Sequence, residues 1–285
     1  MLDKMRFDKR VGFMQGRLSD MTDGRIQSFP WTHWQEEFQI ACEHGFRILE
    51  WTLDQDRLRE QPLMTSVGQA RIREISFRHS LAVVSVTGDC FMQAPFWKAH
   101  GERREELQSD FRMVADACAT MGVRTIVIPL VDNGRLENAA QEEVLVTFMQ
   151  NQAAFLARVN LRVAFESDFG PMELVRFITR FDPAHFGISY DIGNSAALGF
   201  NPTQEVAAYG CRIVNVHVKD RLLGGSTVPL GDGSVDFAAV FRALGEIEYT
   251  GNYVLQTAPA ANGDHAGVLC RYRDMVFSYL TRYGC

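Results

Sequence analysis

The sequence predicts a single (β/α)8 barrel that spans residues 1–285. Short apolar runs alternate eight times with longer amphipathic stretches, a pattern that indicates parallel βαβ units. A barrel of this kind typically needs about 250 residues, and no Pro-, Gly- or Ser-rich linker marks a second domain. An open, doubly wound sheet is the alternative fold. Its usual Gly-x-Gly-x-x-Gly turn is absent from the first expected strand–turn segment, which reads GFMQGRLS.

The first half of the chain provides four strand–helix pairs. Each expected strand is short and apolar, and the expected helices carry apolar residues at spacings of three and four. Two of these helices end on a glycine, Gly45 and Gly122, as helices commonly do. Strands are expected at 11–15, 46–51, 81–89 and 123–130, and helices at 34–45, 64–80, 103–122 and 139–159.

The second half repeats the pattern. Pro171 stands in the first turn of its expected helix, where the missing N–H costs no hydrogen bond. Strands are expected at 161–166, 186–191, 212–218 and 252–256, and helices at 171–181, near 203–209, at 235–246 and at 267–283.

Composition excludes several classes of function. The formal net charge is −6 and no basic block is visible, so nucleic acid is not an expected partner. No apolar run approaches the length of a membrane span, and the charged start MLDKMRFDKR has no apolar signal segment. We therefore expect a cytoplasmic protein. Its six cysteines lack paired spacing, and several lie inside apolar segments, which suggests small core residues rather than disulfide bridges.

Polar residues stand at the carboxyl ends of the expected strands, where barrel enzymes place their chemistry. Any one of them is explained equally well as a solvated loop charge or a helix cap. The eight positions are Gln15, Glu50, Asp89, Asp132, Glu166, Asp191, His217 and Gln256.

Four successive strands contribute one candidate metal ligand each. These residues are Glu166, Asp191, His217 and Gln256. Two carboxylates, an imidazole and an amide oxygen favour one divalent cation, namely Mn²⁺, Mg²⁺, Co²⁺ or Zn²⁺. Such an ion polarises a carbonyl or adjacent hydroxyl groups.

Basic residues follow several strands and indicate an anionic or polyhydroxyl ligand. Each of them, taken alone, is more simply explained as a solvated charge on a loop. The residues are Arg17, Arg135, Lys219 and Arg221. The glycine loop PLGDGSVDF at 229–237 opens a helix and could take a phosphate, although a tight turn explains it more simply.

Several motifs together resemble one protein family over nearly the whole chain. They are GFMQGRLS, IQSFPWTHWQEEF, ILEW, ESDFGP, YDIGN and VHVKDR. The chain resembles the xylose isomerase-like barrels, also called the sugar phosphate isomerase/epimerase superfamily. In that family Glu, Asp, His and Glu at strand ends hold one divalent metal. Glu166, Asp191 and His217 match the first three, whereas Gln256 stands where the ketose 3-epimerases have a second Glu.

The resemblance implies a divalent-metal-dependent isomerase or epimerase that acts on a sugar, keto-sugar or sugar phosphate through an enediolate. Glu166 would be both metal ligand and general base. An amide exchanges no proton near neutral pH, so Gln256 cannot be the second base. Isomerisation or dehydration with one base stays open, and epimerisation would need another acid. Asp89, Glu50 and a metal-bound water are the candidates.

The remaining expected site residues would contact the substrate. Asn194, three residues after Asp191, matches a family position that contacts the ligand or the surroundings of the metal. The residues expected to bind substrate are Arg17, Glu50, Asp89, Asn194, Lys219 and Arg221.

Three alternative functions compete with this one. A metal-dependent sugar-acid dehydratase would use the same ligands, and a non-catalytic sugar-binding barrel would explain the loss of a carboxylate at Gln256. An abasic-site endonuclease of the related family needs three zinc ions and many more histidines, which the sequence lacks. The sequence decides neither the substrate nor the metal, and it leaves a homo-oligomer open.

Overall fold

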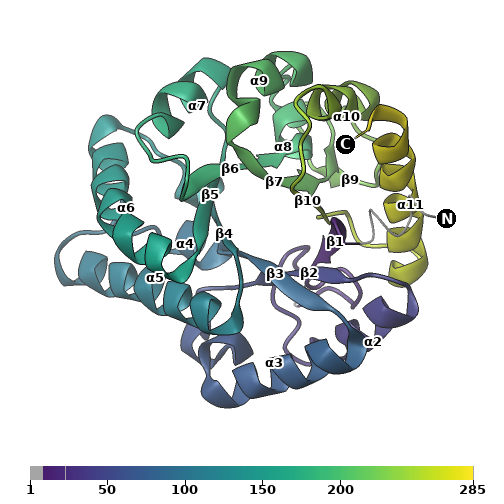
Figure 1. Ribbon diagram of the computed structural model, residues 1–285, viewed down its shortest axis with the longest axis horizontal. Helices are drawn as coiled ribbons and strands as arrows, with labels where there is room; N and C mark the ends of the chain where they lie inside the picture. The colour runs from purple at the N-terminus through teal and green to yellow at the C-terminus, as the bar shows by residue number, and fades with distance from the viewer. Residues whose placement is uncertain (1–8, 23, 285) are drawn as a thin grey trace.

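The computed structural model describes residues 9–22 and 24–284, which form a closed barrel of eight parallel strands surrounded by helices (Figure 1). The strand order is β1-β10-β7-β6-β5-β4-β3-β2, so the strands follow one another around the barrel in chain order. The first strand closes the barrel because Phe13 is paired with Leu49 on one side and Leu255 on the other. The predicted (β/α)8 fold is confirmed.

The barrel strands begin and end within two residues of the expected positions. Their apolar, β-branched composition suits strands that are buried on both faces, as parallel strands are. The bounds are β1 (Val11–Met14), β2 (Ile48–Thr52), β3 (Ala82–Thr87), β4 (Thr125–Leu130), β5 (Arg162–Ser167), β6 (Phe186–Asp191), β7 (Ile213–Val218) and β10 (Asn252–Leu255).

The long helices form the outer ring, and local signals define their ends. Thr65 and Asn138 cap two of them by accepting a backbone N–H, and Gly122 ends another in the left-handed conformation. The bounds are α2 (Glu36–Glu43), α3 (Ser66–His79), α5 (Gly101–Met121), α6 (Ala139–Val159), α7 (Pro171–Ile178), α9 (Pro202–Tyr209), α10 (Phe237–Glu246) and α11 (His265–Tyr283).

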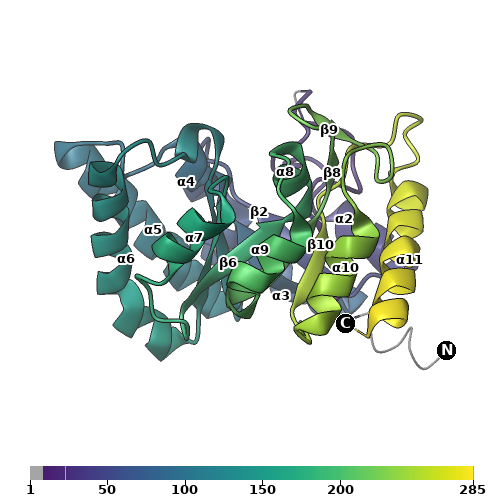
Figure 2. The ribbon, with the colours of Figure 1, turned by 90° about the horizontal axis from the view of Figure 1, so that it is seen from above.

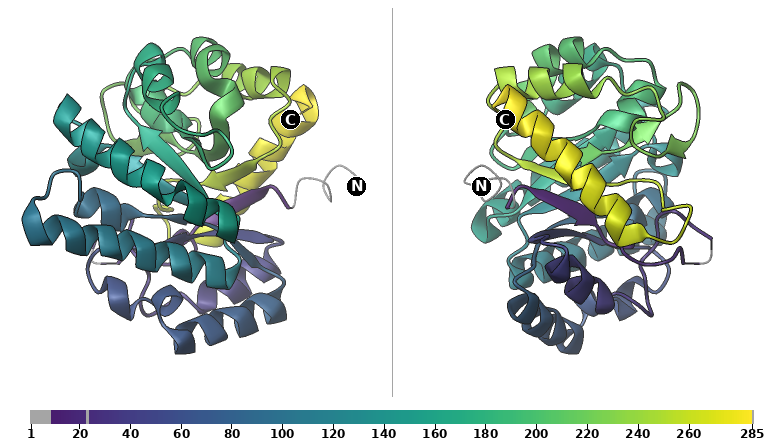
Figure 3. Two further views of the ribbon diagram at one scale, coloured as in Figure 1. Left: turned by 60° about the vertical axis from the view of Figure 1, so that its left-hand side comes forward. Right: turned by 90° about the vertical axis from the view of Figure 1, so that its right-hand side faces the viewer.

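The last helix covers the seam where the first and last barrel strands meet. α11 contacts α10, β1 and β10 and runs obliquely along the outside of the barrel (Figure 3). This contact ties the two ends of the described chain to the same side of the barrel.

Several short elements were not predicted from the sequence. Figure 2 shows that α4, α8 and the β8–β9 hairpin lie together at one end of the barrel. Each follows the carboxyl end of a barrel strand, so this is the end where barrel enzymes place their active sites. The elements are α4 (Asp89–Gln93), α8 (Ile192–Ala197), β8 (Asp220–Arg221) and β9 (Thr227–Val228), and the 3₁₀ turns are Leu58–Glu60, Pro62–Met64, Asp132–Gly134 and Gly210–Arg212.

Aromatic packing outside β5 determines which way its last residues point. The ring of Phe165 is 5.2 Å from that of Phe177 on α7 and 5.0 Å from that of Phe181. Phe165 therefore faces the helices, and because successive side chains of a strand alternate, Glu166 faces the barrel interior.

The cysteines within the described residues form no disulfide. Cys90 and Cys118 are buried, whereas Cys42, Cys211 and Cys270 are partly or fully exposed. Cys285 and residues 1–8, which contain most of the segment checked for a signal peptide, lie outside the described residues. No helix in the described part of the chain is long and apolar enough to cross a membrane.

Candidate active site and metal centre

A cavity of about 550 Å³ opens at the carboxyl ends of the strands. Its volume is within the usual range for a small-molecule site. Six of the predicted site residues line it, namely Asp89, Glu166, Asn194, Lys219, Arg221 and Gln256.

Three of the predicted ligands converge beside this cavity, and Glu166 is the one that lines it. Glu166 lies on β5, Asp191 ends β6 and His217 lies on β7. One donor atom from each lies within 4.8 Å of the others. The Nδ1 atom of His217 is 3.2 Å from Oε2 of Glu166. All three side chains are buried, so two carboxylates face one another in a place where charge is costly without a cation.

Asp191 is held by the short helix that follows it. Its Oδ1 atom caps α8 by accepting the backbone N–H groups of Gly193 at 2.9 Å and Asn194 at 2.8 Å. Its Oδ2 atom remains on the cavity side, 3.2 Å from Nζ of Lys219. Gly193 is required here, because a Cβ would lie 2.8 Å from the Lys219 side chain.

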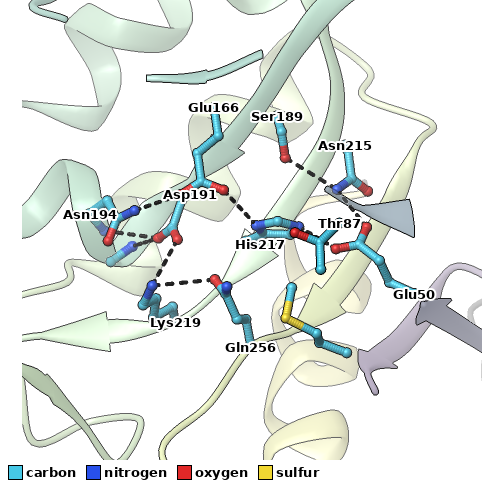
Figure 4. Close-up of polar contacts among 12 residues, drawn as sticks. Glu50, Thr87, Glu166, Ser189, Asp191, Asn194, Asn215, His217, Lys219 and Gln256 are labelled. Carbon is cyan, nitrogen blue, oxygen red and sulfur yellow. Dashed lines mark hydrogen bonds and ion pairs between the residues drawn. The ribbon is translucent and has the colours of Figure 1, made fainter. Parts of the chain in front are cut away.

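Asn194 orients the Glu166 carboxylate. Its Nδ2 group donates to Oε1 of Glu166 at 2.7 Å (Figure 4). Its Oδ1 atom accepts from Nη1 of Arg221 at 2.8 Å. Arg221 in turn donates to the backbone carbonyl of Gly225. Arg221 thus acts on Glu166 through Asn194, and Oε2 of Glu166 is left on the side of His217.

Glu50 orients the imidazole of His217. Nε2 of His217 lies 2.7 Å from Oε1 of Glu50, whose Oε2 accepts from Ser85 at 2.7 Å. A carboxylate accepts, so Nε2 is the donor and the Nδ1 position is turned toward Glu166. Metal-binding histidines are commonly held in this way by a carboxylate.

This environment also changes the protonation of the imidazole. Burial alone would lower the pKa of His217, but the Glu50 and Glu166 carboxylates raise it well above its ordinary value. The described residues therefore favour a positive charge at this position. A divalent cation at Nδ1 would satisfy the same carboxylates and release the proton.

Glu50 is not at the cavity wall, contrary to the expectation that it contacts substrate. Its side chain is fully buried beneath His217 and donor groups surround it. The alternation of side chains along β2 explains this, because Glu50 points into the barrel from the middle of the strand.

We expect Glu50→Gln to weaken metal binding by about 10- to 100-fold, the usual effect of losing a partner behind a ligand. The amide would present a donor as well as an acceptor to His217 and no longer fix one tautomer. Titration calorimetry with Mn²⁺ or Zn²⁺ on folded protein measures the effect. An unchanged dissociation constant would show that Glu50 only fills the interior.

A chain of side-chain hydrogen bonds determines how the Gln256 amide points. Nε2 of Gln256 donates to Oε1 of Gln27 at 2.6 Å, and Nε2 of Gln27 donates to Oδ2 of Asp89 at 2.6 Å. Arg17 donates to the same Gln27 oxygen at 3.2 Å, and Lys219 donates to Oε1 of Gln256 at 3.4 Å. Arg17 and Lys219 can only donate, and the Asp89 carboxylate accepts from Gln27. The Gln256 amide is therefore oriented with Nε2 toward Gln27 and its oxygen toward Lys219.

Arg17 does not reach over the cavity, contrary to expectation. Its side chain is buried, and its Nη1 group donates to the backbone carbonyl of Ile26 at 2.7 Å. Burial lowers the pKa of Arg17 to about 10, although Asp89 and Glu37 oppose this shift. Arg17 therefore remains cationic near neutral pH and supports the segment that carries Gln27, rather than contacting a ligand directly.

Glu37 on α2 anchors the start of the same segment. Its carboxylate accepts the backbone N–H groups of Gly16 at 3.0 Å and Leu18 at 2.9 Å. Burial raises the pKa of Glu37 to about 7, although these hydrogen bonds lower it. This contact fixes the course of the chain immediately before and after Arg17.

Glu37→Ala should destabilise the fold by about 1–3 kcal/mol, because two buried N–H groups would lose their acceptor. A lower midpoint of urea unfolding with an unchanged slope would measure the loss. Glu43→Ala, on the exposed side of the same helix, is the matched control and should change stability by about 0.5 kcal/mol or less. Equal midpoints for the two variants would contradict the assignment.

Two other features that could bind an anion, Arg135 and the glycine loop, already contact carboxylates of the protein itself. Arg135 at the cavity rim forms an ion pair of 2.5 Å with Asp168. The glycine loop at 229–237 surrounds the Asp220 carboxylate, which accepts from Gly231 at 2.9 Å and Gly233 at 3.0 Å. The N–H groups that could hold a phosphate in that loop are therefore already satisfied.

The sequence did not single out Gln27 as a site residue. It lies inside the motif IQSFPW, but neither periodicity nor residue type distinguishes it from other loop glutamines. Only the folded structure brings it between Asp89 and Gln256.

The donor set fits one divalent cation. The donor atoms that lie within 4.8 Å of one another are a carboxylate oxygen of Glu166, a carboxylate oxygen of Asp191 and a ring nitrogen of His217. Lys219 donates hydrogen bonds to both Asp191 and the amide oxygen of Gln256, so Gln256 lies near this cluster. Buried oxygen and imidazole donors suit Mn²⁺, Co²⁺, Zn²⁺ or Mg²⁺.

Comparison with known proteins agrees with this architecture. A family model described as a xylose isomerase-like TIM barrel matches residues 38–269. L-ribulose-5-phosphate 3-epimerase UlaE of Salmonella paratyphi A is 25% identical over 271 residues, which cover 88% of this chain and 91% of the relative.

Solved structures show the same fold at lower identity. D-allulose 3-epimerase from Methylomonas sp., in complex with D-allulose, has a TM-score of 0.72 and 15% identity and covers 95% of this chain and 98% of its own. The IOLI protein with a bound zinc atom has a TM-score of 0.75 and 16% identity and covers 96% and 99%.

Proposed function

This chain belongs to the xylose isomerase-like TIM barrel family, and on that premise we propose that it is a divalent-metal-dependent isomerase or epimerase of a sugar, keto-sugar or sugar phosphate. The observation that carries the proposal is the buried cluster of Glu166, Asp191 and His217, whose donor atoms lie within 4.8 Å of one another beside the cavity. Relatives that are named sugar 3-epimerases support the same reaction class.

Glu166, Asp191, His217 and the amide oxygen of Gln256 would hold the cation. When bound, it would polarise the carbonyl of the sugar and make the adjacent C–H bond more acidic. Asp191 is committed to capping α8 through one oxygen and serves only as a ligand. Glu50 keeps the imidazole of His217 in the orientation that binding requires.

Glu166 is the base in this proposal. Asn194 holds its Oε1 atom, so the carboxylate is fixed at the cavity wall with Oε2 on the side of His217. It would take the proton from the carbon beside the carbonyl and leave an enediolate. Delivery of a proton to the neighbouring carbon gives isomerisation, and delivery to the opposite face of the same carbon gives epimerisation.

Lys219 lines the cavity and donates hydrogen bonds toward Asp191 and Gln256. Its ammonium would bind an oxygen of the substrate and stabilise the negative charge that develops in the enediolate. Arg221 would contribute mainly by holding Asn194.

A dehydratase is the second candidate, favoured by the neutral amide at Gln256. The same base would remove the proton, and a hydroxyl group on the next carbon would then leave. Incubation with a sugar acid distinguishes the two, because only the dehydratase forms a deoxy-keto product.

Turnover with and without metal tests the proposed function. D-allulose and L-ribulose 5-phosphate, the sugars in the names of two relatives, are suitable probes. We expect conversion of at least one of them to an isomer, lost with EDTA and restored by Mn²⁺, Co²⁺, Zn²⁺ or Mg²⁺. Absence of both turnover and metal uptake would refute the proposal.

A further inference from the structure

An epimerase needs a proton donor on the face of the substrate opposite its base. In the described part of the chain, Asp89, Asp132 and Asp168 are the other carboxylates that line the cavity with Glu166. Asp168 is neutralised by its ion pair with Arg135 at 2.5 Å. Asp132 lies exposed to water at the rim. Asp89 differs from both.

Asp89 is 3% exposed although it lines the cavity, and it forms no ion pair with the described lysine, arginine or histidine side chains. It is the first residue of α4, directly after β3, whereas Glu166 is on β5. β4 lies between these two strands, so the two carboxyl groups approach the cavity from different positions on its wall.

The two oxygens of Asp89 have different surroundings. Oδ2 accepts from Nε2 of Gln27 at 2.6 Å, whereas among the described residues Oδ1 has only the hydroxyl of Thr87, at 3.4 Å. A proton on the carboxyl group would therefore be at Oδ1. The bond from Gln27 is kept in both protonation states, so the group can gain and lose a proton without moving.

Burial is the main reason why the protonated form of Asp89 is favoured. Burial raises its pKa to about 7, the hydrogen bond from Gln27 lowers it, Asp54 and Glu166 raise it, and Arg17 lowers it. A group with such a pKa is present in both forms near neutral pH, as an efficient acid–base catalyst should be.

We propose that Asp89 is the second proton-transfer residue, which delivers a proton from Oδ1 to the face of the enediolate opposite Glu166. This inference rests on the proposed function. Glu166 takes the proton of the C–H bond, and the electron pair of that bond forms the C=C bond of the enediolate. The C=C pair then takes the proton of Asp89, and the carbonyl re-forms. Exchange of protons with water reprotonates Asp89 and deprotonates Glu166, so no proton is consumed.

Asp89→Asn in D₂O separates this role from a structural one. The isosteric amide keeps an acceptor for Gln27 but has no acidic proton. We expect the variant to exchange the proton beside the carbonyl for deuterium at a rate near that of the wild type, while formation of the epimer falls by about 10²-fold or more. Asp116→Asn on the exposed face of α5 is the matched control and should leave the ratio of epimer to exchange unchanged.

Two further measurements keep the test decisive if Asp89→Asn folds poorly. In the wild type, the ratio of epimer formation to exchange should fall as the pH rises through about 7, because Asp89 loses its proton. The double variant Asp89→Asn with Gln256→Glu should form the epimer again, because a second carboxyl group would then line the cavity.

The inference would be overturned if Asp89→Asn lost deuterium exchange and epimer formation equally, or if it left the ratio of epimer to exchange unchanged. A wild-type ratio that does not vary with pH would also overturn it. Failure of the proposed function has a different signature, because the wild type itself would then neither exchange nor convert the sugar, and the inference would fall with it.

Discussion

Glu166→Gln should lower kcat by about 10²-fold or more while the barrel stays folded. The amide has the size of the carboxylate and can still accept from Asn194, but it cannot take a proton from carbon. Initial rates with the best sugar substrate, measured beside circular dichroism and thermal unfolding, check this expectation.

Glu173→Gln on the exposed face of α7 is the control for the same chemical change. It should keep the wild-type rate, because its side chain is remote from the cavity wall. Wild-type turnover in Glu166→Gln would place the base elsewhere, and Asp89 would then be the residue to examine.

Asp191→Asn should remove most of the stabilisation that a divalent cation gives the folded protein. A cation at 100 times its dissociation constant raises the free energy of unfolding by about 2.7 kcal/mol. The variant loses one of two carboxylate ligands, and the new amide N–H groups would face the ammonium of Lys219. Loss of a partner behind a ligand weakens binding by about 10- to 100-fold, so loss of the ligand itself should exceed this.

Thermal unfolding with and without added Mn²⁺ or Zn²⁺ measures this effect. Asp168→Asn is the matched control, because Asp168 lines the same cavity but pairs with Arg135. Its metal-induced shift should equal that of the wild type. An undiminished shift in Asp191→Asn would mean that the cation binds outside the cluster of Glu166, Asp191 and His217.

The clustering of Glu166, Asp191 and His217 could be predicted because the fold could. The ends of eight alternating strands are readable from apolar runs, and barrel topology brings residues such as Glu166 and His217 to one end. What the sequence did not provide is the direction of individual side chains. Glu50 lies only a few positions from a strand end, yet it points into the barrel interior beneath His217.

Long loops were the other source of error. Arg17 follows a strand, which suggested a position over the cavity, but Glu37 and the carbonyl of Ile26 hold it inside the segment that leads to Gln27. Such a course depends on contacts between residues distant in the chain, and neither periodicity nor residue type reveals them. The short helices α4 and α8 were missed for a related reason, since one turn carries no readable period.

Solvent deuterium incorporation by the wild-type enzyme tests the central claim most directly. The sugar that is converted should carry deuterium on the carbon beside the carbonyl when the reaction runs in D₂O with a bound divalent cation. This result is expected because Glu166 would take that proton onto a carboxylate that lines a cavity open to water. Conversion of the sugar without any deuterium at that carbon would contradict proton abstraction by Glu166 and the enediolate that follows from it.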